Sequence, residues 1–362
     1  MSRKRKAVIL AAVLVAVGCY ADVFGTGTNQ FSIDFVLIGN ADNSADANGY
    51  GAVDYDYRIG RTEVTIDEFA KARAADSLIS DGDEGYWNDG TRTVGGGGPA
   101  SYVSAYEGMK FANWLTTGSA IGGAYQFSGD GLTLLAVDRA AAVSTYGTVY
   151  VLPSEDEWYK AAYYKPINDG TYSLFANGSD ELGDLTHGTT EGWNYYSSGY
   201  VNGFPNYMWE AGFGGPEQNG TYDMMGNVWE WCESAFDGST NNPVADRVYR
   251  GGLATAGYGF LRSTSRNGFN PAADGNEAFG FRVAAIGATP VPAIVVSINI
   301  DSAVGIEWSS ISGQSYQVQY STNLVSTNWF DLGGVISATN ATGYSVDYST
   351  GVSHRFYRVI SD

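Results

Sequence analysis

The sequence predicts an α+β domain with little regular secondary structure, followed by a small all-β module. Three observations predict this organisation. Short apolar runs alternate with segments that begin in capping boxes, which indicates strands and helices within one domain. Residues 166–220 are rich in Gly, Asn and aromatic residues but show little periodicity. After a linker at residues 287–293, strand-like segments recur at short spacing with turn residues between them, which is typical of a β-sandwich.

The chain begins with a predicted secretory signal. Four basic residues precede an apolar run that is too short to span a bilayer comfortably. Small residues before Asp22 predict cleavage there, so that the signal covers residues 1–21. The alternative is a lipoprotein anchored through Cys19, although residues 16–18 form a poor lipobox. We therefore expect an exported bacterial protein, either periplasmic, on the cell surface or secreted.

The mature chain is expected to be strongly acidic. Residues 1–21 carry four positive charges and no negative ones, so their removal changes the formal net charge from -19 to -23. A chain of this charge is a poor binder of nucleic acid and of anionic membranes. The charge suits divalent cations, or serves solubility alone. No transmembrane segment is expected in the mature chain.

The first half of the domain is expected to combine short strands with three capped helices. In a capping box, a Ser or Thr is followed three residues later by a Glu, and the two side chains satisfy backbone N–H groups at the helix start. Thr65 with Glu68 has this spacing. The expected elements are strands at Phe31–Ile38, Tyr55–Ile59 and Val149–Pro153, and helices that follow Thr65, Ser104 and Ser154.

The second half contains the most unusual stretch of the chain, Asn219–Glu233, which reads NGTYDMMGNVWEWCE. It combines aromatic residues, glycines and carboxylates, and it fits neither a helical period nor strict alternation. It is therefore predicted to be a fixed irregular loop, with buried indoles on one side and converging oxygens on the other. Strands are expected at Arg247–Gly252 and Phe279–Ala285, with the segment Leu261–Pro271 between them.

The C-terminal module is predicted to span residues 294–362 as a shortened fibronectin-like or immunoglobulin-like sandwich. Its strand-like segments are Ile294–Ile300, Gly305–Trp308, Tyr316–Tyr320, Trp329–Leu332, Tyr344–Tyr348 and Arg355–Ile360.

Several motifs in order suggest a family. They are YRIGRTEVT (Tyr57–Thr65), YVSAYEGMKFANWL (Tyr102–Leu115), VLPSEDEWYKAA (Val151–Ala162), NGTYDMMGNVWEWCE, RVYRGG, LRSTSR and GFRVA. Together they resemble the formylglycine-generating enzyme, or sulfatase-modifying factor, family over residues 31–285. The resemblance implies a domain at residues 22–286 with a fold similar to a C-type lectin, a mixed α+β architecture that usually binds calcium.

The resemblance also implies a calcium site on the Asn219–Glu233 stretch. Calcium takes about six to eight oxygen ligands on a tightly turned loop. The family's loop supplies a side-chain oxygen, two backbone carbonyls and a glutamate at positions held here by Asp223, Gly226, Val228 and Glu230. Two of these are carboxylates, which gives the site formal charge. In the alternative, Asp223 and Glu230 cap turns or accept hydrogen bonds from backbone amides.

A second family calcium site falls on Asn194, the carbonyl of Tyr195, Asn202 and the carbonyl of Phe204. Asn202 stands where the family often has Asp. These four residues include no carboxylate, so a weaker site is expected unless other ligands contribute.

The resemblance does not extend to the catalytic residues. The family's oxidases use two cysteines that bind copper(I), and soft thiolates select that ion. They would fall within Leu253–Phe260 and just after it. Ala256 stands at the first position, and the second falls near Gly259–Leu261 without a cysteine. Copper is therefore not expected. Cys232 lies elsewhere and is interpreted as a small buried apolar residue.

Other candidate site residues are weaker. Arg250, Arg262 and Arg266 are candidates for a cleft that binds a carboxylate or a peptide backbone, but structural salt bridges with the many acids explain them as well. The 26 tyrosines and nine tryptophans allow a surface that stacks on carbohydrate or peptide, although such residues also form cores.

Two functions follow from these residues. In the first, the protein is a calcium-stabilised member of the family that lacks the catalytic cysteine pair, a pseudoenzyme that binds or scaffolds a protein, peptide or glycan. In the alternative, it is a formylglycine-generating-type oxidase that acts on a sulfatase cysteine.

Overall fold

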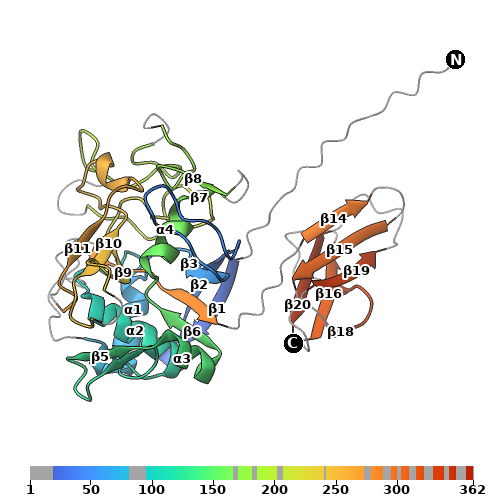
Figure 1. Cartoon of the computed structure of the whole chain (residues 1–362), viewed down its shortest axis with the longest axis horizontal. Coiled ribbons are helices and arrows are strands. Elements are labelled where there is room, and N and C mark those ends of the chain that lie inside the picture. The colour runs from blue at the N-terminus through green and yellow to red at the C-terminus, as the bar shows by residue number, and fades with distance from the viewer. Residues whose placement is uncertain are drawn as a thin grey trace. The chain divides into compact units, whose positions relative to one another are not determined.

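The computed structural model describes residues 19–80, 95–165, 170–181, 186–201, 207–239, 242–272 and 279–287, and shorter segments between 295 and 361. Contacts divide the chain into two compact units (Figure 1). One unit covers Val17–Ala288, and the other includes Thr289–Asp362. Within these described residues, no helix combines the length and apolar character needed to cross a membrane.

A five-stranded antiparallel sheet forms one side of the first unit, in the order β1-β2-β3-β13-β6. The predicted strand Phe31–Ile38 is confirmed with the same bounds, and the expected strands at Tyr55–Ile59 and Val149–Pro153 form with ends shifted by one or two residues. The strands are β1 (Cys19–Phe24), β2 (Phe31–Ile38), β3 (Tyr57–Gly60), β6 (Thr148–Val151) and β13 (Ala284–Gly287).

Strand β1 overlaps the predicted signal segment. Cys19 pairs with Val36 and Ala21 with Asp34 in the antiparallel register of β2. Asp22, the predicted first residue of the mature chain, bonds to the guanidinium of Arg58 at 2.8 Å. Cleavage before Asp22 would therefore shorten β1 but keep this ion pair. Export itself stays a prediction.

All three predicted capping boxes are confirmed. In each box, the hydroxyl of the cap residue accepts from the backbone N–H of the glutamate three positions later, and the carboxylate of that glutamate accepts from the backbone N–H of the cap residue. The cap residues are Thr65, Ser104 and Ser154. A further helix and a hairpin lie in a stretch where none was expected. The helices are α1 (Ile66–Ala75), α2 (Ala105–Thr117), α3 (Arg139–Tyr146) and α4 (Glu155–Tyr163), and the hairpin is β4 (Tyr125–Phe127) with β5 (Leu134–Val137).

A second sheet has the order β11-β10-β9-β12, with β12 parallel to β9. The prediction of an irregular loop through Glu233 is wrong at its end, because β9 begins at Trp229. A central strand buried on both faces shows no alternation. The predicted strand Phe279–Ala285 is two strands, β12 and β13, which belong to different sheets. The strands of the second sheet are β9 (Trp229–Ala235), β10 (Arg247–Arg250), β11 (Asn267–Phe269) and β12 (Phe279–Gly280).

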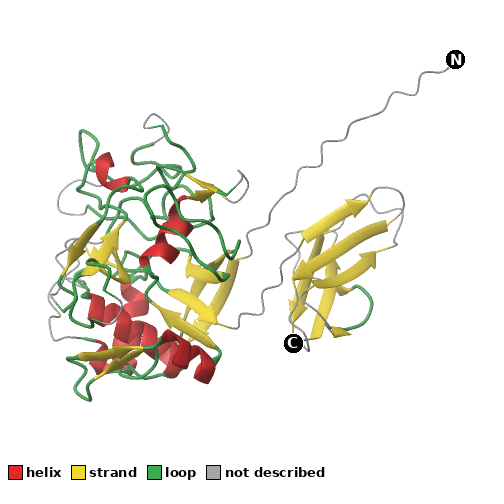
Figure 2. Cartoon of the chain, in the orientation of Figure 1, coloured by secondary structure: helices red, strands yellow, loops and turns green. Residues whose placement is uncertain are grey.

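Loops make up much of the first unit, as predicted for residues 166–220 (Figure 2). In its described part, this span contributes only the strand β8 (Thr171–Tyr172), which pairs with β7 (Tyr164–Lys165). Among the described residues, 3₁₀ helices interrupt the loops at η1 (Gly27–Asn29), η2 (Ser77–Ile79) and η4 (Tyr258–Leu261). Buried side chains such as Phe175 and Trp193 tie these loops to the core.

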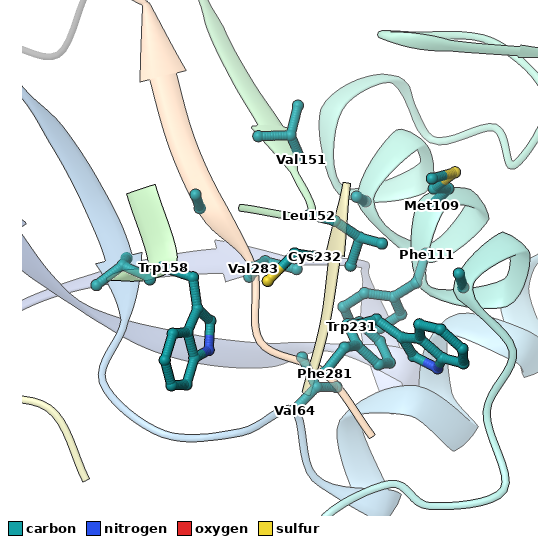
Figure 3. Close-up of a cluster of buried hydrophobic side chains, with 14 of the residues drawn as sticks. Val64, Met109, Phe111, Val151, Leu152, Trp158, Trp231, Cys232, Phe281 and Val283 are labelled. Carbon is teal, nitrogen blue, oxygen red and sulfur yellow. The ribbon is translucent and has the colours of Figure 1, made fainter. Parts of the chain in front are cut away.

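The core lies between the two sheets and α2. Trp231 of β9 is fully buried, stacks on Phe279 at 4.9 Å between ring centroids, and donates its indole N–H to the carbonyl of Val103. Trp158 of α4 and Cys232 are fully buried on the other side of β9 (Figure 3). Truncating an indole of this kind to alanine typically costs about 3–5 kcal/mol of stability.

The described part of the second unit forms two small sheets. One has the order β14-β15-β19, and in the other β16 pairs with β17, β18 and β20. Ile306, Trp308, Tyr316, Val318 and Val359, which come from both sheets, form its core. All six predicted strand positions hold strands, and β18 was not predicted. The strands are β14 (Val295–Asn299), β15 (Ala303–Ser309), β16 (Ser315–Ser321), β17 (Phe330–Asp331), β18 (Ile336–Ser337), β19 (Thr342–Asp347) and β20 (Phe356–Ser361).

Candidate functional site

The loop that precedes β9 follows a backbone path that only certain residues adopt. Asp223 and Asn227 have φ angles of +59° and +58°, and Gly226 has +92°. A Cβ atom at Gly226 would lie 2.1 Å from the carbonyl oxygen of Asn194, so only glycine fits there. The N–H of Asn227 donates to the same carbonyl at 2.8 Å. Gly226 of the first predicted calcium site therefore contacts Asn194 of the second.

Glu230, a predicted calcium ligand, forms a fully buried ion pair with Arg282. The guanidinium bonds both carboxylate oxygens, each at 2.6 Å. The indole of Trp158 donates to Oε2 at 2.8 Å. Burial lowers the pKa of Arg282, but the charge and hydrogen bonds of Glu230, together with the charges of Glu217 and Glu63, outweigh this effect and raise the pKa overall. Arg282 lies between β12 and β13, so this ion pair also explains why the predicted strand Phe279–Ala285 is interrupted there.

Asp223, the other predicted carboxylate ligand, is buried and accepts N–H groups from a neighbouring loop. Its Oδ1 accepts from the indole of Trp209 at 2.8 Å, and its Oδ2 accepts from the backbone of Gly212 at 2.6 Å. Burial raises the pKa of Asp223 to about 6 despite these bonds. Asp223 thus accepts a hydrogen bond from a backbone amide, which is the interaction expected under the alternative to calcium.

A third carboxylate, Glu63, belongs to the same cluster and was missed by the sequence analysis. It follows β3 and is buried, with Oε2 accepting from the side chain of Asn227 at 2.8 Å and Oε1 from the backbone of Val228 at 3.3 Å. Burial and the charges of Asp223 and Glu230 raise its pKa well above the ordinary value. Only its place in the RTEVT motif could have indicated it, because its partners are more than 160 residues away.

Glu217 lies near the same cluster and was not predicted either. Its Oε2 accepts from the Thr221 hydroxyl at 2.9 Å and from the backbone of Met224 at 3.1 Å. Its Oε1 is buried and has no hydrogen-bond donor among the described residues. Burial, partly offset by Arg282, raises the pKa of Glu217 to about 8.

The second predicted calcium site is only partly described. Asn202 and Phe204 lie outside the described residues. Tyr195 is buried, and its ring packs edge-on against His187 at 5.2 Å. The side-chain nitrogen of Asn194 donates to the Tyr207 carbonyl, while its Oδ1 is buried without a donor among the described residues.

These features fit a hard cation in charge and in oxygen chemistry. Glu63, Asp223 and Glu230 are three carboxylates, and Arg282 is the one cation that bonds to them among the described residues. A carboxylate offers about four lone-pair positions, of which the N–H donors use only part. In the described part of the chain, however, no group of three or more acidic, His or Cys side chains is arranged to hold a metal ion. An ion would therefore rely on backbone carbonyls as well, and calcium at Asp223, Gly226, Val228 and Glu230 stays a prediction.

The position expected for the catalytic thiols follows β10 after a glycine turn. The side chain of Ala256 is mostly buried, and its carbonyl accepts from the backbone N–H of Tyr196 at 2.9 Å. Leu261 is fully buried at the end of η4. Cys232, by contrast, is fully buried within β9, and burial raises the pKa of its thiol well above the ordinary value. It is therefore not available as a thiolate.

Four half-exposed aromatic residues lie on the two loops that meet at this position, and we call them the aromatic shelf: Tyr196, Tyr200, Tyr258 and Phe260, each 42–46% exposed. The rings of Tyr196 and Tyr200 lie 5.0 Å apart, and Phe260 packs edge-on against Trp229 at 5.7 Å. A bridge between Tyr196 and Gly257 joins the two loops that carry the shelf.

Two of the three arginines proposed for a cleft form ion pairs within the protein. Arg250 is buried and bonds Glu155 at 2.6 Å, and Arg266 bonds the same carboxylate at 2.8 Å. Arg250 and Arg266 therefore form the structural salt bridges that were the alternative to a binding cleft. The guanidinium of Arg262 lies 5.2 Å from the ring centroid of Tyr258, beside the shelf.

Comparison with known proteins defines the class of this domain. Residues 35–286 match the family described as the sulfatase-modifying factor enzyme 1-like domain, and the chain belongs to this family. A comparison with curated proteins found no match. Similar solved structures include Treponema denticola variable protein 1, at 20% identity and a TM-score of 0.49, covering 73% of this chain and 98% of that one.

Two further structures are similar to this chain at the same level. CarF is 21% identical, with a TM-score of 0.48 and coverage of 70% of this chain and 97% of its own. PvdO from Pseudomonas aeruginosa is 20% identical, with a TM-score of 0.46 and coverage of 73% and 97%. Likeness at this level carries no argument about what the present chain binds or does. The predicted α+β fold of the family is confirmed by the family match and by the mixture of few helices with many strands.

Proposed function

We propose that this protein is an exported, calcium-stabilised recognition protein that uses the family fold without its oxidase chemistry. The observation that carries the proposal is the aromatic shelf, which lies on the two loops that meet at the position where the thiol pair is expected. Ala256 stands at that position, and the loops on either side carry exposed rings.

The missing thiols argue against oxidation of a substrate cysteine. Copper(I) binding in proteins depends on soft sulfur ligands, and Ala256 and Gly259 supply none. Cys232 is fully buried with a raised pKa, so it cannot replace them without unfolding its strand.

The shelf has the properties of a recognition surface. Exposed tyrosines offer a rigid apolar face together with a hydroxyl, and they stack on peptide or sugar groups with little loss of conformational entropy. Exposed apolar groups that gather on one part of a surface often mark a binding site. The ligand class we propose is a protein, peptide or glycan.

Calcium in this proposal has a structural role. Asp223 and Glu230, with the carbonyls of Gly226 and Val228, would hold one ion, and Asn194 would contribute to the second site. The unpaired Oδ1 of Asn194 and the excess of buried carboxylates over cations support the assignment. A bound ion would supply positive charge to this cluster and fix the loop against Asn194.

The decisive experiment compares binding with turnover. Copper(I) is titrated into the mature chain, and the chain is incubated with a cysteine-containing sulfatase peptide while aldehyde formation is followed by mass spectrometry. We expect neither stoichiometric tight copper binding nor aldehyde. If both appeared, the alternative function, a formylglycine-generating-type oxidase, would replace this proposal.

Recognition is tested separately on an array of extracellular glycans and peptides. The double variant Tyr258→Ser/Phe260→Ser is expected to lose the ligands that the wild-type chain retains. The control is Tyr146→Ser, because Tyr146 is similarly exposed, at 48%, but lies on α3. Equal losses in the control and the double variant would exclude the shelf as the binding surface.

A further inference from the structure

The first unit contains a half-open pocket that does not include the shelf or the predicted calcium ligands. Its volume is about 780 Å³, within the range of ligand sites in proteins. It lies between the start of α4, the β4–β5 hairpin and the connection from β9 to β10. We call it the β9–β10 pocket.

The two arginines in the wall of this pocket already donate hydrogen bonds to the protein itself. Arg266 already donates to Glu155 and to the carbonyl of Phe236. The terminal nitrogens of Arg247 donate to the backbone carbonyls of Asn242, Pro243 and Ala245.

Two of the four carboxylates in the wall, Asp156 and Glu233, each keep one oxygen without a donor among the described residues. Oδ1 of Asp156 accepts from the backbone of Gly51, while Oδ2 accepts from no described residue. Oε2 of Glu233 accepts from Tyr125 and Arg139, while Oε1 accepts from no described residue. A ligand that pairs with these oxygens must bring hydrogen-bond donors, and a cationic donor gives the stronger bond.

One part of the lining is apolar. Leu135 and Val137 of the hairpin, Phe236 and Pro243 line the same pocket as the two carboxylates. Leu135 is 59% exposed, so it has surface left for a ligand. Lysine and arginine side chains combine an aliphatic stem with a cationic head, which matches an apolar wall that ends in carboxylates.

One buried group favours a peptide over a free amine. Arg247 lines the pocket with 3% of its surface exposed, and its Nε has no acceptor among the described residues. A peptide main chain carries carbonyl oxygens that can supply this acceptor, whereas an alkylamine carries none.

We propose that the β9–β10 pocket binds a lysine or arginine side chain presented by a peptide or protein. Asp156 and Glu233 receive the cationic head, and the aliphatic stem lies along Leu135 and Val137. The formal net charge of -19 also favours the encounter with a basic partner. This inference is independent of whether the aromatic shelf binds a ligand.

The test uses acetyl-Gly-Lys-Gly-amide and its norleucine analogue, which has the aliphatic stem without the charge. Binding to the mature chain is followed by the NMR signals of the Leu135 and Val137 methyl groups. We expect the lysine peptide to shift these signals and to bind at least about tenfold more tightly than the norleucine peptide. Equal affinities, or no shift at millimolar lysine peptide, would overturn the proposal.

Variants with matched controls locate the site. Asp156→Asn is expected to weaken lysine-peptide binding about fivefold or more, because the carboxylate charge is lost while an acceptor for Gly51 remains. Its control is Asp130→Asn, an exposed aspartate in the turn of the β4–β5 hairpin outside the pocket.

Leu135→Arg places a competing cation in the pocket and is expected to abolish binding. Leu132→Arg is its control, since Leu132 is similarly exposed on the same hairpin but does not line the pocket. Both leucines are exposed, so this pair remains informative if Asp156→Asn fails to fold. If Leu132→Arg weakened binding as much as Leu135→Arg, the attraction would come from the overall acidic charge, and the pocket would be excluded.

Discussion

Removal of calcium is expected to destabilise the unit that covers Val17–Ala288. Among the described residues, three buried carboxylates, Glu63, Asp223 and Glu230, have one bonded cation, Arg282, so a divalent ion would complete the neutralisation. An ion that binds only the folded state stabilises it by about 2.7 kcal/mol at a concentration 100-fold above its dissociation constant. In a domain of this size, a loss of 1 kcal/mol of stability lowers the melting temperature by about 2–4 °C. Chelation should therefore lower it by about 5–10 °C.

The assay is thermal unfolding followed by circular dichroism, in calcium and in chelator, for the wild type and two variants. Glu230→Gln should abolish the difference between the two conditions. It should also lower stability in both, because breaking a buried ion pair by removing one partner costs about 3–5 kcal/mol. The informative quantity is therefore the calcium-dependent shift within each variant.

Glu155→Gln provides the matched control. Glu155 is also buried and also bonds a buried arginine, Arg250, at 2.6 Å. This variant should lose stability but keep the full calcium response. A wild-type melting temperature that is indifferent to chelator would refute the calcium assignment. Loss of the response in Glu155→Gln as well would show that it reports general damage to the fold.

Three further predictions concern backbone, pH and domain structure. Gly226→Ala should destabilise the unit by about 3 kcal/mol or more in chemical denaturation, because φ is +92° and the new Cβ meets the Asn194 carbonyl at 2.1 Å. Burial raises the pKa of Glu217 to about 8, so the folded state holds this proton more tightly than the unfolded state. Stability in chelator should therefore fall as pH rises from about 4.5 to about 8. Glu217→Gln should reduce that slope, as measured by denaturation at several pH values, while Asp223 and Glu63, whose pKa values are also raised by burial, keep part of it. Deletion of residues 290–362 should leave the melting curve of the first unit unchanged, because its core cluster is separate from that of the second unit.

The features predicted well from the sequence are those that depend on a few adjacent residues. The capping boxes after Thr65, Ser104 and Ser154 need only a residue and its neighbour three positions later, so their geometry forms as expected. The strand Phe31–Ile38 is similar, because its alternating start marks a face that packs inward.

The features that were missed depend on residues far apart in the chain. The strand β9 shows no alternation because it lies between β10 and β12 and is buried on both faces. Arg282 interrupts the predicted strand Phe279–Ala285 because its guanidinium bonds Glu230, 52 residues away. The β9–β10 pocket was also missed, since its two carboxylates come from α4 and β9.

The Asn219–Glu233 stretch connects the buried charges to the aromatic shelf through Asn227. Its side chain donates to Glu63, its backbone N–H donates to the carbonyl of Asn194, and its carbonyl accepts from Ala254 at 3.0 Å. Asn194 lies two residues before Tyr196, and Ala254 lies two residues before Ala256, which bonds Tyr196. Both loops of the shelf are thus tied to the residue that bonds the carboxylate cluster. The like charges of that cluster repel one another when its carboxylates are ionised. An ion or proton that neutralises them is therefore expected to stabilise the two loops of the shelf as well.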